Sequence, residues 1–413
     1  MPKLQVLYRV FAGFERSFAA QAAAFQHQHP DVDFNIVPID PEKLYEDLIA
    51  KRGILGSDWD VVLLLTDWLP ELLKMGGLAR LNDFIQRDPP PDYPQGWSDS
   101  LLELQRDAAG GIFALPYHDG PEMFMYRADL FENPAEQTAF AARYGYPLAV
   151  PETWSQFRDM ARFFTRPEQG LYGAMIAGLN DGHNNVYDFF LHVWSRGGQL
   201  FDAAWKPTFN DAIGREALQF YADLILTDKV CPPKTLDYDS VASGVAYAAG
   251  EAAMMWNWCG FSAVAELPPS KIIGQNRLGL VPRGDHGAHA TLNIYWVLGI
   301  PAGSAQPELA YQFLQHCATS EMDKITAQSG GTGVRRSTWR DAEIQAQFPY
   351  YRMLEAAHAN AKSPPRLPEY PAINEVFNQM QHAVVTGAKS VEEALDDAAR
   401  AVESIMAAAG YYT

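Results

Sequence analysis

The chain has 413 residues, more than one ordinary domain needs and about enough for two. Its 32 Lys and Arg stand against 50 Asp and Glu, and a net charge of −18 without any basic block argues against nucleic acid as a partner. The sequence contains no run of about 18 apolar residues, the length that a membrane-spanning helix needs. The three cysteines (Cys231, Cys259 and Cys317) lack the spacing of a zinc motif. We therefore expect buried, apolar cysteines, no metal and no cofactor.

The start of the chain bears on its compartment. Met1-Pro2-Lys3 leads directly into a predicted strand, with no basic region, apolar core or cleavage site before it. Two cases stay open: a cytoplasmic protein, or one from which a signal peptide was removed.

Residues 1–115 alternate between strands and helices. Strands are predicted at residues 4–11, 32–36 and 61–65, and between them apolar residues recur at helical spacing, as at Phe14 and Phe18. This order predicts an α/β fold with a doubly wound parallel sheet. Ligands of such sheets bind beyond the carboxyl ends of the strands, so the loops at 12–15 and 66–68 are candidate ligand loops.

The pattern changes twice further along the chain. A predicted strand at 110–117 leaves the first unit and is followed by further strands and helices. An apolar strand at 293–300 marks a second change near residue 290. The other predicted elements are strands at 123–126 and 172–176, a polar loop at 180–185, and helices at 153–164, 187–196, 211–228 and 390–406, the last beginning with a capping box.

Several segments, taken in their order and spacing, resemble the extracellular solute-binding proteins of ABC importers. They match the carbohydrate-binding family that includes maltose-binding proteins, and the resemblance covers nearly the whole chain. The segments are residues 60–65 with Trp68-Leu69-Pro70, Leu115-Pro116-Tyr117, residues 125–131, Pro151-Glu152-Thr153-Trp154, residues 250–255 and residues 298–304.

The resemblance implies a two-lobed binding-protein fold, with a doubly wound sheet flanked by helices in each lobe and a ligand cleft between the lobes. Lobe one would hold residues 1–115 and 290–335, and lobe two 116–289 and 336–413. The expected function is capture of a small carbohydrate by hinge closure and delivery to the membrane permease. A periplasmic or extracytoplasmic location and a monomeric state suit that role.

A sugar needs carboxylates or amides for its hydroxyls and aromatic rings for its C–H faces. Asp67 and Trp68 offer both at one strand end, although Trp68 would also serve to pack the next helix and Asp67 to cap it. Tyr117, His118 and Asp119 follow the predicted crossing, where an ordinary turn is the alternative.

The other candidates come from single patterns. Trp256 and Trp258 share a strand face, which core packing explains equally well, and Arg335 would bind an anionic sugar through its donor fork or else pair with a carboxylate. The remaining candidates are Gly13, Phe14 and Glu15 in the first loop, Asn184 in the amide-rich loop, Trp296 in the return strand and Gly331 in a glycine loop.

Three alternatives stay open beside a carbohydrate. A polyamine or other cation would suit carboxylates and aromatic rings, provided that Asp67 and Asp119 converge. A glycoside hydrolase would use the same residue types, but Gly96-Trp97-Ser98-Asp99-Ser100 lacks the second glycine of a nucleophile elbow. Ferric iron is disfavoured, because Tyr350-Tyr351 lies in a predicted helix without a clear carboxylate partner.

Overall fold

The computed structural model describes residues 2–412, and the chain folds into two units. Unit 1 contains the residues up to 121, then 293–359 and 365–368, and unit 2 contains 122–292, 360–364 and the residues from 369 onward. Each unit is thus assembled from separate stretches of chain, and the chain passes from one unit to the other near residues 121, 292, 359, 364 and 368.

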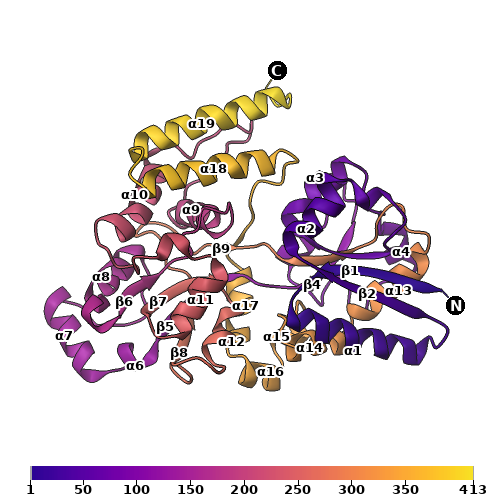
Figure 1. Cartoon of the computed structure of the whole chain (residues 1–413), viewed down its shortest axis with the longest axis horizontal. Helices are drawn as coiled ribbons and strands as arrows, with labels where there is room; N and C mark the ends of the chain where they lie inside the picture. Colours follow the sequence, from indigo (N-terminus) through magenta and orange to yellow (C-terminus); the bar gives the residue numbers. More distant parts are fainter. Residues whose placement is uncertain (1, 413) are drawn as a thin grey trace. The chain divides into compact units, whose positions relative to one another are not determined.

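A five-stranded sheet in the order β2-β1-β3-β10-β4 forms the centre of unit 1. Figure 1 shows α1 and α14 below this sheet, with α2 and α3 on its other side. The elements of unit 1 are β1 (Lys3–Arg9), α1 (Ala12–Gln28), β2 (Asp33–Ile39), α2 (Pro41–Tyr45), η1 (Glu46–Ala50), η2 (Gly53–Leu55), β3 (Val61–Leu65), η3 (Thr66–Trp68), α3 (Leu69–Lys74), α4 (Asn82–Arg87), α5 (Asp99–Glu103), β4 (Ala114–His118), β10 (Trp296–Gly299), α13 (Pro307–Cys317), α14 (Ser320–Gln328), α15 (Arg336–Trp339), α16 (Ala342–Gln347) and α17 (Tyr351–His358).

One strand of this sheet departs from the predicted parallel arrangement. β1 pairs in parallel with β2 and β3, as expected, but β10 lies between β3 and β4 and runs antiparallel to both. The reason is the chain path: β4 leaves unit 1 at the carboxyl edge of the sheet, and the chain returns at that edge near residue 293. A strand that enters at the carboxyl edge must run back against its neighbours.

The last predicted boundary also differs from the structure. The family resemblance implied that everything after residue 335 belongs to lobe two, whereas residues 336–359 and 365–368 belong to unit 1. Residues 336–359 are held there because the Asp323 carboxylate on α14 accepts hydrogen bonds from the backbone N–H groups of Val334 (2.8 Å) and Arg335 (3.1 Å). The Trp339 indole N–H donates to the Gly333 carbonyl at 2.8 Å, which anchors α15 to the same loop.

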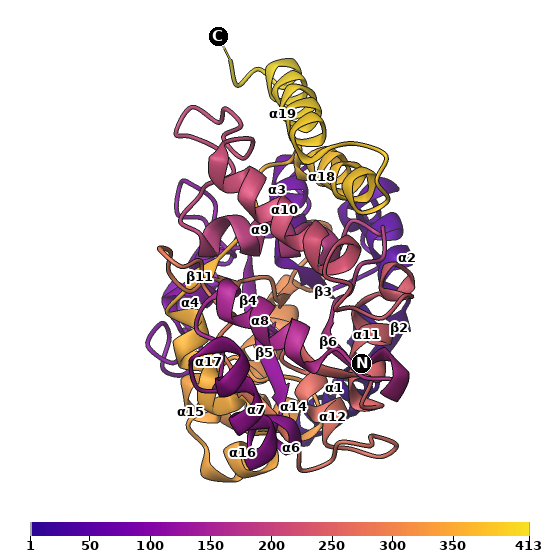
Figure 2. The same ribbon diagram turned by 90° about the vertical axis from the view of Figure 1, so that its left-hand side faces the viewer.

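The sheet of unit 2 has the order β6-β7-β5-β8, with β6 parallel and β5 antiparallel to β7. Figure 2 shows α18 and α19 lying side by side in this unit. Its elements are β5 (Glu122–Arg127), α6 (Ala128–Phe131), α7 (Pro134–Tyr144), α8 (Trp154–Phe164), η4 (Pro167–Gln169), β6 (Tyr172–Met175), α9 (Asn184–Ser195), α10 (Ala212–Leu226), η5 (Thr235–Asp237), α11 (Ser240–Ala248), β7 (Ala252–Trp258), α12 (Phe261–Ala265), β8 (Asn276–Gly279), β9 (Thr291–Leu292), β11 (Ala361–Lys362), α18 (Tyr370–Val385) and α19 (Val391–Ala408).

Local sequence signals explain several of these elements. Thr153 and Gln156 form a capping box at the start of α8, and Ser390 and Glu393 form the predicted one at the start of α19. The three cysteines are buried, as expected. None of the helices that the structure describes is long and apolar enough to cross a membrane.

Candidate functional site

The carboxyl edge of the unit 1 sheet brings together residues from distant parts of the chain. β1 ends at Arg9 and β3 at Leu65, and the antiparallel β10 begins at this edge because Trp296 is paired with Leu65. On its other side Trp296 is paired with His118, the last residue of β4. Asp67 lies two residues after the end of β3, in η3.

Aromatic rings line this edge. The Trp68 ring lies 5.6 Å from that of Trp296 at 82°, and the Tyr45 ring contacts Trp68 at 5.4 Å. Phe14, in the first turn of α1, packs edge-on against His118 with ring centroids 4.9 Å apart. The predicted candidates Phe14, Trp68, His118 and Trp296 therefore lie in one region of unit 1.

His118 is a neutral donor in this setting. Its Nδ1 accepts a hydrogen bond from the backbone N–H of Thr332 at 2.7 Å, which places the ring proton on Nε2. Burial and, to a smaller extent, the nearby positive charge of Arg9 lower the pKa of His118 to about 3. The imidazole is therefore uncharged at physiological pH and presents one N–H.

Arg9 is a residue that the sequence reading missed. Its guanidinium carbon lies 5.1 Å from the Trp296 ring centre, 5.6 Å from that of Phe11 and 5.8 Å from that of Phe14. The guanidinium has no hydrogen bond or ion pair within residues 2–412, and its Nε is buried. The only available signal was an arginine at the end of an apolar strand.

The predicted glycine positions allow close backbone approach beside these rings. A Cβ on Gly13 would lie 2.5 Å from the Phe11 ring and 3.1 Å from the backbone of Gly330. A Cβ on Gly331 would lie 2.9 Å from the Thr326 side chain and 3.5 Å from His118 Nδ1. Both glycines thus help to pack the loops of this edge.

Not every candidate lies with them. Glu15 is exposed on the first turn of α1. Tyr117, one residue before His118 and so on the opposite strand face, is buried. Its hydroxyl is bonded to Ser17 Oγ (2.8 Å) and donates to Gln21 Oε1 (3.0 Å). This tyrosine therefore belongs to the core of unit 1.

Asp119 is also engaged inside the unit. Its carboxylate accepts hydrogen bonds from the backbone N–H of Gly120 and from His358 Nε2, both at 2.8 Å. His358 Nδ1 in turn accepts from the Ser100 hydroxyl at 2.8 Å. The Asp119 side chain is buried and already holds two donors, so it offers little to a ligand in this state.

Arg335 does not fit its predicted role as an anion binder. Its side chain is only 1% exposed and lies over Trp97 at 4.3 Å. The guanidinium donates to the carbonyl oxygens of Pro91 (3.0 Å) and Ala318 (2.6 Å) and to the Asp92 carboxylate (3.0 Å). The structure instead agrees with the other alternative, in which Arg335 pairs with a carboxylate, here that of Asp92.

The carboxyl edge of the unit 2 sheet has a smaller polar cluster. Trp258 ends β7 opposite Glu122, which begins β5. Asn184, the first residue of α9, donates from Nδ2 to Glu122 Oε1 at 3.0 Å and accepts at Oδ1 from the Trp258 indole at 3.2 Å. His183 also contacts the Trp258 ring, with centroids 5.6 Å apart. The candidates Asn184 and Trp258 therefore belong to one cluster.

Trp256 lies deeper along the same strand face, in the core of unit 2. Its indole donates to Asp188 Oδ1 at 2.6 Å, and Trp154 packs against its ring at 5.3 Å. Glu122 and Asp188 are both buried, and burial raises the pKa of Glu122 to about 8. Burial, reinforced by the charge of Glu122, also raises the pKa of Asp188. Neither carboxyl was singled out from the sequence.

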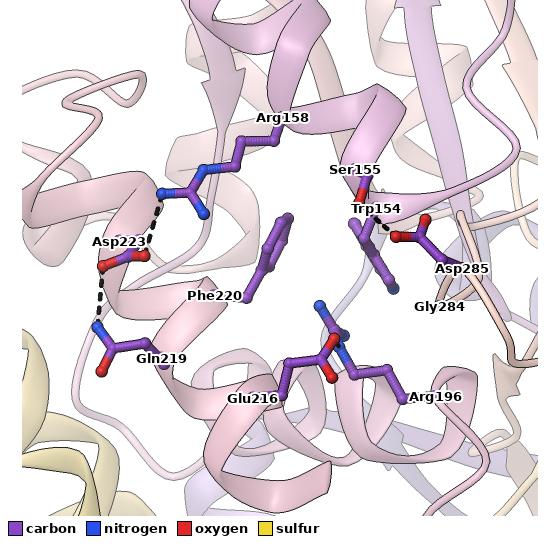
Figure 3. A pocket seen from close by; sticks show the side chains of 10 residues that line it. All are labelled: Trp154, Ser155, Arg158, Arg196, Glu216, Gln219, Phe220, Asp223, Gly284 and Asp285. Carbon is purple, nitrogen blue, oxygen red and sulfur yellow. Dashed lines mark hydrogen bonds and ion pairs between the residues drawn. The ribbon is translucent and has the colours of Figure 1, made fainter. Parts of the chain in front are cut away.

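A separate pocket of about 230 Å³ lies among α8, α9 and α10 of unit 2 (Figure 3). Its charged groups are paired with one another: Arg158 with Asp223 at 3.0 Å, and Arg196 with Glu216 at 2.9 Å. Trp154 and Phe220 add aromatic rings to its lining, but because these charges are already paired, the pocket offers a ligand no unpaired guanidinium.

Comparison with known proteins gives consistent results. The model of the family described as bacterial extracellular solute-binding protein matches residues 11–324. A mannitol-binding protein of Pseudomonas aeruginosa is 26% identical over 415 aligned positions, which cover 94% of this chain and 89% of that protein.

Solved structures share the fold. The maltose-bound MalE3 of T. maritima has a TM-score of 0.84 at 23% identity and covers 98% of this chain and 100% of its own. A solute-binding protein of Agrobacterium vitis S4 with bound D-mannitol has a TM-score of 0.81 at 23% identity, with both chains covered completely. A ribitol complex from Agrobacterium radiobacter K84 has a TM-score of 0.84 at 23% identity and covers 98% of each chain.

Proposed function

Because the chain belongs to the family of bacterial extracellular solute-binding proteins, we propose that it captures a small carbohydrate and delivers it to an ABC importer. Among carbohydrates, an open-chain polyol or a simple sugar is the ligand we favour. The mannitol-binding relative and the mannitol and ribitol complexes of structural neighbours support this choice.

The observation that carries the proposal is the combination of groups at the unit 1 sheet edge. Trp68 and Trp296 provide apolar faces for C–H groups, while the neutral His118 and the unpaired Arg9 provide donors for hydroxyl oxygens. A neutral hydrogen bond contributes about 0.5–1.5 kcal/mol net. Several such bonds with ring contacts therefore suffice for the roughly −8 kcal/mol of micromolar affinity.

Transport by this family implies further steps, which we include in the proposal. The protein acts outside the cytoplasmic membrane as a monomer, binds without chemical conversion, and is recognised by the permease. Ligand binding shifts the two units toward a closed arrangement, since a ligand favours the state in which it makes more contacts.

A polyamine is the alternative that the sequence left open, and it required Asp67 and Asp119 to act together. The Asp119 carboxylate is buried and already bonded to His358 and Gly120, which weakens that reading. Arg9 and its positive charge weaken it further, because a cationic ligand would be repelled at this edge.

A binding screen tests the proposal. We expect D-mannitol, ribitol or a related polyol to raise the melting temperature, because a ligand at 100 times its Kd stabilises the folded state by about 2.7 kcal/mol. Titration calorimetry then gives the affinity, and an osmolyte such as trimethylamine N-oxide at equal concentration controls for general stabilisation. A response to spermidine alone, or to none of the sugars and polyols, would refute a carbohydrate ligand.

A further inference from the structure

Arg9 differs from the other arginines that are enclosed in unit 1. Arg335 donates to two carbonyls and a carboxylate, and Arg366 donates to the carbonyl oxygens of Glu103, Leu104 and Arg106 at 2.8–3.0 Å. Arg9 has no such partner among residues 2–412, although its Nε is buried.

Its surroundings offer rings instead of acceptors. Trp296, Phe11 and Phe14 lie within 5.8 Å of the guanidinium carbon. The charge of Arg9 also acts on His118, whose imidazole is neutral. Burial lowers the pKa of Arg9, and no carboxylate offsets that effect. A partly buried donor group without an acceptor costs free energy, and an acceptor on a bound ligand would offset that cost.

The location identifies where that acceptor would come from. Arg9 is the last residue of β1, at the sheet edge where η3, β10 and His118 also meet. Ligands of α/β sheets bind at this edge. The rings that hold the guanidinium include Trp296, one of the aromatic faces of the candidate site.

We propose that Arg9 is a ligand-binding residue whose guanidinium fork donates to two neighbouring oxygens of the ligand. On a polyol these are vicinal hydroxyls, and on a sugar acid they include the carboxylate. This inference rests on the proposed function and adds the residue that selects for paired oxygen acceptors. It also gives Arg9 the anion-binding role that was one of the two alternatives for Arg335.

Calorimetric titration of the full chain tests this role with D-mannitol, ribitol and D-gluconate as probes. We expect Arg9→Gln to lose at least tenfold in affinity for any probe that the wild type binds, and Arg9→Lys to retain part of it. The loss should be larger for gluconate than for the polyols, because the gluconate carboxylate adds attraction between opposite charges to the hydrogen bonds that the guanidinium donates. Arg87→Gln, which removes an exposed arginine of unit 1, is the matched control and should bind as the wild type does.

The possible outcomes separate the two proposals. A wild-type chain that binds none of these probes, nor any other carbohydrate, overturns the proposed function and this inference with it. A wild type that binds while Arg9→Gln binds equally well overturns the role of Arg9 alone. Thermal unfolding of each variant shows whether it is folded. If Arg9→Gln does not fold, the affinity of Arg9→Lys tests the role of Arg9 instead.

Discussion

Arg335 shows how one buried cation can be held entirely by its own chain. Its guanidinium uses a fork geometry toward Pro91, Ala318 and Asp92 that an ammonium group does not reproduce. We expect Arg335→Lys to lower the free energy of unfolding by about 2–4 kcal/mol, because breaking a buried, hydrogen-bonded charge is costly. Urea denaturation measures this loss, with Arg336→Lys as the neighbouring control.

The same variant discriminates between a structural and a ligand-binding role. Measured under conditions where the protein is folded, ligand affinity should change less than twofold. A large loss of affinity with unchanged stability would restore the anion-binding role.

Glu122 makes the stability of unit 2 depend on pH. Burial holds its pKa at about 8, whereas in the unfolded chain the carboxyl ionises near its ordinary value of 4.5. The unfolded state therefore releases a proton that the folded state keeps, and the free energy of unfolding falls as pH rises from about 4.5 to about 8. Glu122→Gln keeps the acceptor for Asn184 and removes this ionisation.

We expect Glu122→Gln to gain stability relative to the wild type between pH 5 and pH 8. The gain should be at least about 1.4 kcal/mol, the equivalent of one pKa unit. Urea denaturation across this range measures it, and Glu403→Gln on the exposed face of α19 is the control. Parallel pH profiles for wild type and variant would contradict the assignment.

Sequence reasoning at this scale found residue types more readily than their environments. It could predict that His118 follows the crossing strand and that Trp256 and Trp258 share a strand, because strand positions follow from apolar runs. It could not predict that Tyr117 and Trp256 are buried. The direction and depth of a side chain depend on which distant segments pack against its strand. Arg9 was missed for a related reason: only the folded sheet shows that its guanidinium lacks a partner.

At the scale of elements, the packing of α8 on β6 depends on one glycine. A Cβ at Gly173 would lie 1.8 Å from the carbonyl oxygen of Ala161, a backbone atom of α8 that no rotamer change can move. We expect Gly173→Ala to destabilise unit 2 by about 3 kcal/mol or more, because the helix must shift away from the sheet. Thermal or urea unfolding measures the loss.

Gly260→Ala is the matched substitution, because no heavy atom lies within 4 Å of its Cβ position. It should change stability by less than about 0.5 kcal/mol. Equal losses in both variants would show that the α8–β6 contact does not determine the effect.

Elements with a local signal were predicted well. Neighbouring residues determine the caps of α8 and α19 and the helical spacing of α1. These three predicted helices were therefore confirmed, with small differences at their ends. Asn184 and Asn185 were expected in a loop and instead begin α9. The antiparallel insertion of β10 follows from the path of the whole chain, which no local pattern encodes.

On the scale of the whole molecule, three of the five passages between the units lie beside one hydrogen-bonded cluster of unit 1. Asp119 and His358 precede two of the passages, Asn293 follows a third, and Asn293 Nδ2 donates to the Ser100 carbonyl at 2.8 Å. The ends of three connections are thus fixed within one unit. The resemblance to two-lobed proteins predicted such connections, but their position after residue 358 depended on contacts of α15 that the sequence did not reveal.

Fixed connection ends favour motion of each unit as a body over local unfolding, and this leads to a prediction in solution. If the ligand contacts both sheet edges at once, it binds more tightly to an arrangement in which they face each other, and its addition populates that arrangement. We expect small-angle scattering to show a smaller radius of gyration at saturating ligand, with unchanged far-ultraviolet circular dichroism. Arg9→Gln should show the same decrease only at ligand concentrations raised in proportion to its weaker affinity, because a ligand shifts the equilibrium only by its differential affinity for the two states. An identical radius with and without bound ligand would rule out closure and leave capture by a single unit.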